Sequence, residues 1–394
     1  MSGYKNIALK EIMASKLGSI DPSKFKQEIF DLYSIPAFDS GKPEVISGSE
    51  IGSTKQIVQP NDVLLSKIVP HIRRTWIVGK DNGRRIIASG EWIVFRSKLI
   101  EPRYLRHVLV SDLFHAHFMQ TVSGVGGSLL RARPAQVASI EVPFPPISEQ
   151  KRIAEILDRT QSLISKRKEA IAKLDTLTQS IFVAMFGDPE LKKWQIETVN
   201  DVVHPSRGSI RTGPFGSQLL HSEFVAEGIA VLGIDNAVAN EFRWGERRFI
   251  SEAKYQELKR YTVKPNDVII TIMGTCGKCA IVPDDIPLAV NTKHLCCITL
   301  NQKKCLPRFL QAYFLFHPIS NRYLEQTKKG AIMSGLNMSI IQAMPIFCPP
   351  LALQKEFAQR VEAVEKLKAT HRASLSQLEA LFDSLQHRAF RGEL

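Results

Sequence analysis

The chain has 394 residues, of which 44% are hydrophobic and 23% charged, and it carries a formal net charge of +13. This composition excludes collagen-like, mucin-like and wholly disordered proteins, and the length suggests two or three domains. No apolar run approaches the ~18 residues of a membrane-spanning helix, and the first residues show no secretory signal. All six cysteines lie after residue 275 and cannot staple the whole chain, so we expect a reduced cytoplasmic protein.

The first part of the chain, residues 1–146, has the pattern of a mixed globular domain. Short strand-like runs alternate with turn clusters, and a helical pattern follows near 103–119. The strand-like runs are 63–65, 76–78, 86–88 and 92–95. Because strands come first and helices late, we expect an α+β arrangement and not a doubly wound sheet.

A long helix is predicted in the following segment, 147–189. From Ser148 to about Phe186 there is no glycine or proline, and apolar residues recur at helical spacing. The proline pair before this run suits a helix start, and the Gly-Asp-Pro sequence at 187–189 suits a helix end. At 1.5 Å per residue such a helix would be ~55–60 Å long.

Residues 190–350 repeat the first domain. The sequence Pro-Asn-Asp at 60–62, with its apolar run, returns at 265–267, a shift of 205 residues. The sequence Pro-Pro at 145–146, followed by Gln-Lys, returns at 349–350 with a shift of 204. A helical pattern near 307–327 also matches that of the first domain. Two independent matches at nearly the same offset indicate one duplicated protein.

The last segment, 351–394, is predicted to be a second long helix. Its apolar residues alternate in steps of four and three, with Lys368 and His371 breaking the middle. A helix with one apolar stripe must bury it, and the repeat of the helix is the obvious partner. We expect an antiparallel coiled coil that relates the two domains by a pseudo-twofold axis. The alternative is two separate amphipathic helices, each packed on its own domain.

The positive charge is concentrated in the two globular segments. Residues 1–146 carry 19 basic and 13 acidic groups, and residues 190–350 carry 19 and 14. The two helical segments are nearly neutral, with 7 basic and 6 acidic groups each. This distribution favours two polyanion-binding modules joined by segments that contact proteins. The alternative from charge alone is a basic soluble enzyme.

Motifs of common catalytic sites are missing from the sequence. We find no phosphate-binding G-x-x-x-x-G-K-[ST] loop, no G-x-S-x-G elbow and no H-E-x-x-H. The glycine-rich turn of an adenosylmethionine site and the tetrapeptide typical of adenine methyltransferases are also absent. A nuclease-like fragment, Glu252-Ala253-Lys254, follows Ser251 and is better explained as a capped helix start.

The cysteines at 276, 279, 296 and 297 resemble half of a zinc ribbon. However, the second pair is adjacent in a strand-like run, where neighbouring side chains point to opposite faces. The first repeat has no cysteine at all, so a metal cannot be essential to the fold. We expect buried free thiols, with zinc as the less favoured alternative. In the pair His115 and His117, the spacing within a helical pattern also argues against a metal site.

Binding chemistry remains as the expected activity of both domains. A glycine-rich loop at 124–134 ends in two arginines and a helix start, which suits phosphate or guanine edges. The candidates in the first domain are Arg73, Arg74, Arg84, Arg85, Ser128, Arg131 and Arg133. Those in the second domain are Arg207, Arg211, Gln218, Lys278, Lys328 and Lys329. Taken singly, each is better explained as a solvated surface charge than as a base-contacting residue, but the charge distribution favours them as a group.

The whole chain resembles the specificity subunit of bacterial type I restriction-modification systems. The start of the first long helix, Pro145-Pro146 with Glu149-Gln150, is similar to the family's proline-proline, glutamate-glutamine sequence. Further family-like stretches are 142–154, 182–189, 212–219, 264–268, 273–277 and 389–394. One departure is Leu353, where the family has a glutamate before the glutamine of the second helix; it removes a favourable charge at the helix start.

The resemblance implies a non-catalytic, DNA-binding subunit of α+β fold, with two target recognition domains separated by two conserved helices. Each domain would bind one half of a split site in double-stranded DNA, and the helices would set the gap and contact two methylation subunits. Restriction subunits would join through those subunits. No cofactor is expected in this chain, because adenosylmethionine, ATP and magnesium are implied only for the partner subunits.

Two other classes of function remain open from the sequence. A self-contained nuclease or methyltransferase with a disguised site would modify DNA alone. A structural adaptor would use its basic domains to bind a protein and would show no affinity for DNA at low salt.

Overall fold

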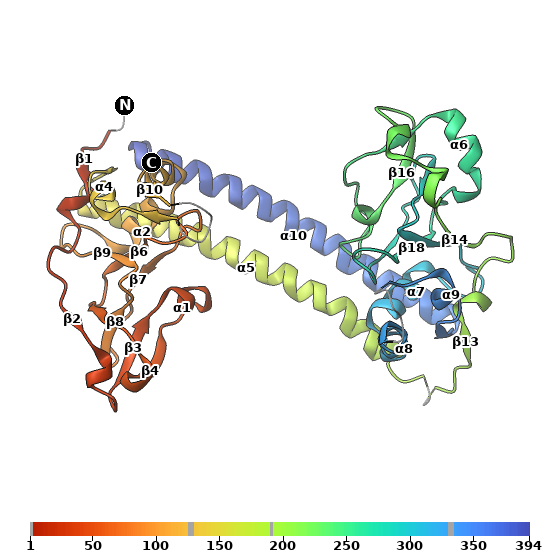
Figure 1. Cartoon of the computed structure of the whole chain (residues 1–394), viewed down its shortest axis with the longest axis horizontal. Coiled ribbons are helices and arrows are strands. Elements are labelled where there is room, and N and C mark those ends of the chain that lie inside the picture. Colours follow the sequence, from red (N-terminus) through yellow and green to blue (C-terminus); the bar gives the residue numbers. More distant parts are fainter. Residues whose placement is uncertain (1–2, 125–129, 190–191, 330–334) are drawn as a thin grey trace. The chain divides into compact units, whose positions relative to one another are not determined.

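Two long helices run through the computed structural model of the chain (Figure 1). Helix α5 spans Ile147–Phe186 and helix α10 spans Leu351–Arg391. The long helices predicted from the sequence are therefore confirmed. The structure describes residues 3–124, 130–189, 192–329 and 335–394, without the side chains of residues 328 and 329. None of the helices in these ranges combines the length and the apolar character that crossing a membrane requires.

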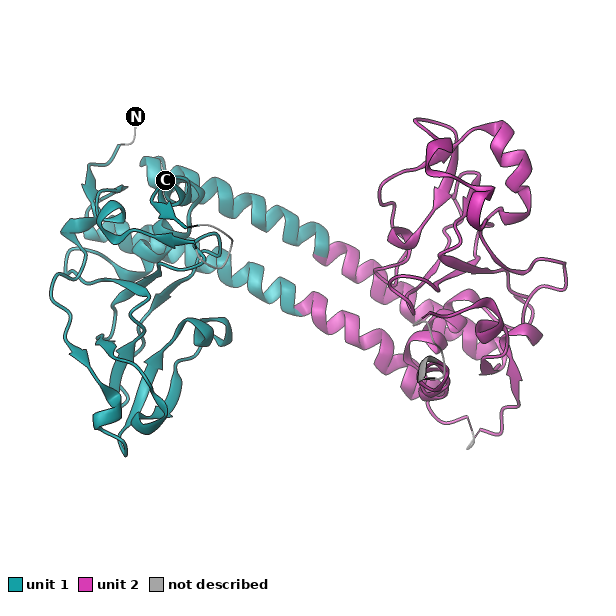
Figure 2. Cartoon of the chain, in the orientation of Figure 1, with its two compact units in different colours: residues 1–169, 372–394 teal, residues 170–371 magenta. Residues whose placement is uncertain are grey.

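The chain divides into two compact units, each built around its own core (Figure 2). Unit 1 comprises residues 1–169 and 372–394, and unit 2 comprises residues 170–371. The sequence predicts helices that form segments of their own, but in the structure each unit contains a part of both. The reason is that the apolar stripe of each helix contributes to both cores, at opposite ends of the helix.

Unit 1 contains a three-stranded antiparallel sheet, β7-β6-β9, and a five-stranded mixed sheet, β2-β5-β8-β3-β4. In the mixed sheet β3 and β8 are parallel, and a separate pair joins β1 to β12. The strands are β1 Asn6–Ala8, β2 Ser19–Ile20, β3 Ile29–Tyr33, β4 Glu44–Ser47, β5 Lys55–Ile57, β6 Val63–Ser66, β7 Thr75–Ile77, β8 Arg85–Ala88, β9 Trp92–Phe95, β10 Val122–Ser123, β11 Arg131–Ala132 and β12 Glu141–Pro143. The helices are α1 Ile35–Ser40, α2 Pro102–Val110, α3 Asp112–Gln120 and α4 Pro134–Val137.

Unit 2 has the same plan with different loops. Its sheet β14-β21-β18-β19 corresponds to β7-β6-β9, and its sheet β15-β17-β16-β20 again holds one parallel pair, β16 with β20. The strands are β13 Ile196–Thr198, β14 Ile210–Thr212, β15 Phe224–Val225, β16 Ile229–Leu232, β17 Phe249–Ile250, β18 Val268–Thr271, β19 Cys279–Ile281, β20 Ala289–Asn291, β21 Leu295–Ile298 and β22 Pro345–Phe347. The helices are α6 Glu252–Leu258, α7 Pro307–Phe316, α8 Pro318–Lys329 and α9 Met338–Gln342. The expected internal repeat of two mixed domains is confirmed.

The repeated Pro-Asn-Asp sequence forms the same turn in both units. Asn61 and Asn266 both adopt a left-handed backbone, with φ of 69° and 65°, a conformation that asparagine tolerates well. The carboxylate of Asp62 accepts a hydrogen bond from a backbone N–H at 2.8 Å, and so does that of Asp267. The turn thus leads each chain segment into the central strand, β6 or β18, with a buried carboxylate at its start.

The repeated glutamine at the start of each long helix joins that helix to its own domain. The side chains of Gln150 and Gln354 are fully buried. Gln150 donates to the carbonyl of Pro145 at 2.9 Å and accepts from the backbone N–H of Glu101 at 2.8 Å. Gln354 makes the equivalent pair of hydrogen bonds, both of 2.8 Å, to Pro349 and Leu306. The motif recognised in the sequence is therefore a structural clasp between α5 and α2, and between α10 and α7.

Within unit 1 the two long helices pack against each other. Ile153 of α5 and Phe390 of α10 belong to one hydrophobic core. Further along, the amine of Lys168 lies 2.9 Å from the carboxylate of Glu379. Residue numbers rise along α5 while they fall along α10, so the helices are antiparallel here.

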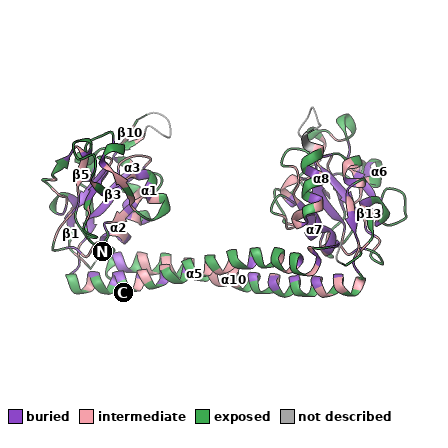
Figure 3. Ribbon diagram, turned by 90° about the horizontal axis from the view of Figure 1, so that it is seen from below, coloured by how far each residue is buried: buried purple, intermediate pink, exposed green. Residues whose placement is uncertain are grey.

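The remaining parts of both helices pair in the same way within unit 2. The ring centroids of Phe182 and Phe357 are 5.5 Å apart in the core. Lys368, which breaks the apolar pattern in the sequence, is nearly buried and lies 2.8 Å from Asp175. In Figure 3 the buried residues lie mainly in the two sets of strands and along part of the helix surfaces. The predicted antiparallel pair is confirmed, and the alternative of two unpaired helices is wrong.

Candidate nucleic-acid interface

In unit 1 three connections meet at one edge of the sheets, where β6 ends. The backbone N–H of Val69 donates to Leu130 at 3.2 Å, and that of Ala132 donates to Lys67 at 2.8 Å. Lys67 in turn donates to the carbonyl of Glu91 at 2.9 Å. We call residues 67–74, 89–91 and 130–134 the loop edge of unit 1. Strand β10, which pairs with β11 beside this edge, lies on the side of unit 1 turned away from α5 and α10 (Figure 3).

Arg73 and Arg74 lie on this edge, and both are engaged by acidic residues. The guanidinium of Arg73 lies 2.6 Å from the carboxylate of Asp112, and that of Arg74 lies 3.4 Å from Asp39. The side chain of Asp112 is almost fully exposed, so this pair is weakly held and open to exchange for a phosphate.

Arg131 and Arg133 also lie on the loop edge and are more available. Arg131 keeps 63% of its side chain exposed and lies 3.3 Å from Glu91. Arg133 precedes α4 as predicted, and its Nε donates to the hydroxyl of Ser123 at 3.0 Å. Ser128, the remaining candidate in this loop, lies outside the described residues.

Three basic side chains lie close together beside the loop edge of unit 1. Burial lowers the pKa of His115, and the nearby charges of Arg73 and His71 lower it further, against the opposing effect of Asp112. These three basic side chains therefore lie close enough to influence one another. Such a cluster attracts anions at the edge where the loops project.

Unit 2 gathers its connections at the corresponding edge, where β18 ends. The backbone N–H of Ile272 donates to His294 at 2.9 Å, and that of Leu336 donates to Ile272 at 3.0 Å. Thr292 is hydrogen-bonded to both Leu232 and Gly213. We call residues 213–220, 233–248, 272–278 and 292–294 the loop edge of unit 2.

Gln218 and Lys278 are brought to this edge, as members of the first and third connections. The amide oxygen of Gln218 accepts a hydrogen bond from the hydroxyl of Tyr261 at 3.0 Å. Lys278 is half-exposed, and its backbone N–H donates to Thr271. Lys328 and Lys329 are the last residues of α8, and their side chains lie outside the described residues.

Three of the candidates lie at the opposite end of the strands. Arg84 and Arg85 stand at the start of β8, where Arg84 lies 2.6 Å from the buried carboxylate of Asp31. Arg85 pairs with Glu28 through two nitrogens, one of them at 2.7 Å. Arg207 is exposed just before β14, also away from the loop edge. The sequence does not separate these arginines from those on the loop edge.

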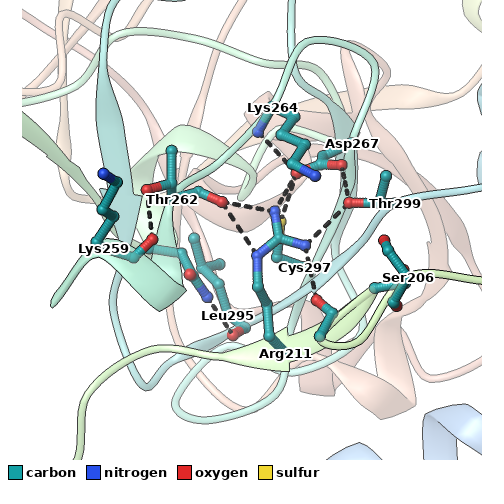
Figure 4. A network of polar contacts seen from close by, with 12 residues as sticks. Ser206, Arg211, Lys259, Thr262, Lys264, Asp267, Leu295, Cys297 and Thr299 are labelled. Carbon is teal, nitrogen blue, oxygen red and sulfur yellow. Dashed lines mark hydrogen bonds and ion pairs between the residues drawn. The ribbon is translucent and has the colours of Figure 1, made fainter. Parts of the chain in front are cut away.

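Arg211 is a correction to the sequence-based prediction, because it is buried inside unit 2 (Figure 4). Its guanidinium pairs with the fully buried carboxylate of Asp267. The same guanidinium donates to the hydroxyl of Thr299 at 2.9 Å and, through two nitrogens, to the carbonyl of Thr262. All three of its nitrogens are used within the protein, so we assign Arg211 a structural role.

The sequence-based prediction did not include the basic and aromatic residues of the loop 242–248 among the DNA-binding candidates. The indole of Trp244 is 38% exposed on the loop edge of unit 2, and the guanidinium carbon of Arg247 lies 5.1 Å from the centre of this ring. The signal was present in the run Phe-Arg-Trp-Gly-Glu-Arg-Arg, in which aromatic and basic residues alternate. Such interleaving is typical of nucleic-acid-binding surfaces.

The cysteines are free thiols, most of them buried. Cys296 and Cys297 belong to two different hydrophobic cores, as expected for neighbours in a strand. Burial raises the pKa of Cys296 to about 12, so this thiol is protonated at neutral pH. Within the described ranges, no three histidine, cysteine or acidic residues cluster in a way that could hold a metal ion.

Comparison with known proteins places this arrangement in a family. The family described as the type I restriction modification DNA specificity domain matches residues 1–174 and 227–380. The chain belongs to this family. The match includes the loop edge of unit 1 and all of the loop edge of unit 2 except residues 213–220.

Curated members of the type I specificity family are similar to the chain at low identity. The EcoBI specificity subunit of Escherichia coli is 23% identical over 286 residues, which cover 64% of this chain and 58% of that protein. The EcoKI specificity subunit of E. coli K12 is 22% identical, over 75% of this chain and 66% of that protein. The chain thus spans less than two thirds of either protein. The MjaVIII specificity subunit of Methanocaldococcus jannaschii is 23% identical, over 88% and 82%.

Solved structures of type I systems share the fold. A chain from a study of complex assembly and conformational transition in a type I restriction-modification system aligns with a TM-score of 0.63. This alignment has 19% identity and covers 100% of this chain and 98% of that one. The S subunit from M. genitalium aligns with a TM-score of 0.58 and 12% identity, over 99% and 96%.

Proposed function

We propose that the chain is the DNA-binding specificity subunit of a type I restriction-modification complex, and that each unit binds one half of a two-part site through its loop edge. The observation that carries this proposal is that both units, built on one repeated scaffold, gather their projecting loops at the same strand ends, together with six of the ten candidate residues whose side chains the structure describes. The family supports the same conclusion, because its members are DNA specificity domains.

Each loop edge would make two kinds of contact with DNA, one for affinity and one for sequence preference. Arginine and lysine side chains would bind phosphates, supplying most of the affinity and making it depend on salt. A few side chains would contact base edges in a groove and supply the choice of sequence. We propose the first role for Arg131 and Arg133 of unit 1 and for Lys278 of unit 2.

The paired helices would set the gap between the half-sites and contact the methylation subunits. At 1.5 Å per residue, α5 is ~60 Å long, more than one ~34 Å turn of B-DNA. Exposed leucines on otherwise polar helix surfaces suit a protein interface. They are Leu163 and Leu381 in unit 1, and Leu177 and Leu367 in unit 2.

The chain would act without a catalytic site or cofactor of its own. In this proposal two methylation subunits supply adenosylmethionine chemistry, and restriction subunits, joined through them, supply ATP-driven cleavage in the cytoplasm. Support comes from the loop edges, where arginine and lysine residues outnumber the acidic residues, an arrangement that suits binding of an anion.

Methylation mapping tests the proposal directly. The chain is expressed with a methylation subunit of the same system, and modified adenines are located in the host DNA. We expect a two-part motif with a fixed gap that disappears when the chain is omitted. Methylation that persists without the chain, or a motif in one part, would contradict the proposal. DNA modification by the purified chain alone would favour a self-contained enzyme.

A domain exchange tests whether each unit binds its own half of the site. Replacing residues 1–146 by those of another family member should change one half of the motif and leave the other half and the gap intact. A change in both halves would contradict independent binding by the two units. Tight binding of the methylation subunit together with no DNA affinity at low salt would favour an adaptor.

A further inference from the structure

One loop of unit 2 holds a large aromatic side chain in solvent beside a cluster of cations. Trp244 lies in the connection between β16 and β17, and Arg247 lies over its ring at 5.1 Å. Beneath it, Phe242 contacts the indole edge-to-face at 5.3 Å and packs against a hydrophobic core of unit 2. The indole is therefore in contact with both Phe242 and Arg247 and still keeps 38% of its surface exposed.

The loop is built to hold this position without a partner. The amide oxygen of the buried Asn236 accepts from the backbone N–H of Gly233 at 2.8 Å, and its amide nitrogen donates to the carbonyl of Arg243 at 2.9 Å. A Cβ at Gly245 would overlap a carboxylate oxygen of Asp235, so a larger residue there would displace the Asp235 side chain. A loop fixed in this way loses little conformational entropy on binding.

Further basic residues lie where the loop joins the sheet, beside the ends of β16 and β20. Strands β16 and β20 are parallel, so the residues that follow them, 233–236 and 292–294, meet at one edge. Burial lowers the pKa of His294, and the charges of Lys293 and Arg248 lower it further. These three basic residues therefore lie together, and Arg248 is held in place by Asp235.

The described residues on the loop edge of unit 1 include no exposed aromatic ring beneath an arginine. Its aromatic residues near the corresponding strand ends face one another instead, with the rings of Tyr33 and Trp76 4.6 Å apart and those of Trp76 and Trp92 6.4 Å apart. The exposed tryptophan is thus a property of one loop edge and not of the repeated scaffold. A feature that the scaffold does not require points to the ligand of that unit.

We propose that Trp244 packs against a base step of the DNA half-site bound by unit 2, while Arg247 and Lys293 contact the adjoining phosphates. This inference rests on the proposed function and adds the residues that make the contact. An aromatic or apolar side chain can wedge against a base step and bend the duplex, most easily at a flexible pyrimidine–purine step. Trp244 would then contribute both affinity and preference for sequence in this half-site alone.

The test compares variants of the chain in complex with its methylation subunit, on a labelled duplex that contains the mapped site. We expect Trp244→Ala to weaken binding at least tenfold, and Trp244→Phe, which keeps a ring, to weaken it less than threefold. The indole carries no charge, so Trp244→Ala should leave the slope of log affinity against log salt unchanged. Lys293→Gln should reduce that slope by ~0.9, the value for one phosphate contact.

Phe25→Ala is the matched control. Phe25 is also an exposed ring beneath an arginine, at 4.5 Å from Arg85, but it lies at the opposite end of the strands in unit 1. We expect its removal to change DNA affinity less than twofold. If Trp244→Ala bound the site as the unchanged chain does, the inference would be wrong and the proposed function would stand. Absence of specific binding by the unchanged complex would instead contradict the proposed function.

A second measurement uses Trp244→Phe, the variant that keeps an aromatic ring at this position. The tryptophan fluorescence of the complex should change on adding the specific duplex, and the difference between the unchanged chain and Trp244→Phe reports on Trp244 alone. We expect the specific duplex to quench the fluorescence of Trp244, so that the signal falls more in the unchanged chain than in Trp244→Phe. An unchanged difference signal under saturating DNA would overturn the inference even if the alanine variant could not be purified.

Discussion

The aspartate of the repeated turn pairs with a different arginine in each unit. In unit 1 the buried carboxylate of Asp62 is paired with Arg96, which follows β9 and keeps a third of its side chain exposed. In unit 2 the equivalent Asp267 is paired with Arg211, which comes from β14 and is almost fully buried. The repeat therefore preserves the acceptor at the start of the central strand, whereas the cation comes from another strand in each unit.

The same contrast extends to the loop edges. The cations of unit 1 are engaged by acidic neighbours, as Arg73 is by Asp112. Unit 2 likewise pairs Arg248 with Asp235, but it adds an exposed aromatic ring, Trp244, beneath Arg247. The buried turns and the glutamine clasps repeat because they hold the fold together. The loops differ because nothing in the shared core constrains them, which is what two different half-sites would require.

Removing the carboxylate of the turn should have the largest effect, and a larger one in unit 2. Asp267→Ala leaves the guanidinium of Arg211 buried without its counter-ion, which costs ~3–5 kcal/mol in comparable cases. Asp62→Ala leaves Arg96 partly in solvent, so we expect the free energy of unfolding to fall by only ~1–3 kcal/mol. Urea unfolding followed by circular dichroism measures both. Equal losses of unfolding free energy in the two variants would show that burial of the arginine does not determine how much the carboxylate contributes.

Acid should weaken unit 2 through a residue that unit 1 lacks. The break between α7 and α8 is formed by His317, and the corresponding break between α2 and α3 is formed by Ser111. Burial lowers the pKa of His317 to about 4, against the opposing effect of a hydrogen bond to the backbone of Phe186. The unfolded chain binds this proton near pH 6.5. Stability is therefore lost as the pH falls from about 6.5 to about 4, and the loss ends below that pH.

His317→Ser places the residue of unit 1 at this break and tests the comparison. At ~1.4 kcal/mol for each pKa unit, the unchanged chain should lose up to ~3 kcal/mol between pH 7 and pH 4 that the variant does not lose. The urea midpoint at several pH values measures this difference, because the carboxylates contribute equally to both proteins. Parallel pH profiles would argue against His317 as the cause.

Long uninterrupted patterns made the scaffold predictable from the sequence. The helices α5 and α10 follow from glycine-free apolar stripes, and Ser251 caps α6 as expected, accepting from the backbone N–H of Lys254 at 3.2 Å. The turn at 265–267 revealed the duplication. In each case the interactions that decide the structure are local, or repeat at a fixed offset.

The candidate site was less predictable, because it depends on the order of strands in the sheets. Arg207 and Arg211 lie four residues apart and look alike in the sequence, yet one is exposed and the other buried beside Asp267. Likewise, the sequence does not tell at which end of its strand Arg85 or Arg131 lies. Strand pairing between distant segments decides this, as in the parallel pairing of β3 with β8.

The smallest effect that we expect is on DNA binding, and it compares two arginines at opposite ends of the strands in unit 1. Arg131 lies on the loop edge, and Arg85 lies at the opposite end of the strands, paired with Glu28. Arg131→Gln should weaken binding of the specific duplex three- to tenfold and reduce the salt slope by ~0.9, as expected for one lost phosphate contact. Arg85→Gln removes the same charge from the same unit and should change neither quantity. Fluorescence anisotropy at four salt concentrations measures both. A similar loss in the two variants would mean that net charge, and not the loop edge, determines where the DNA binds.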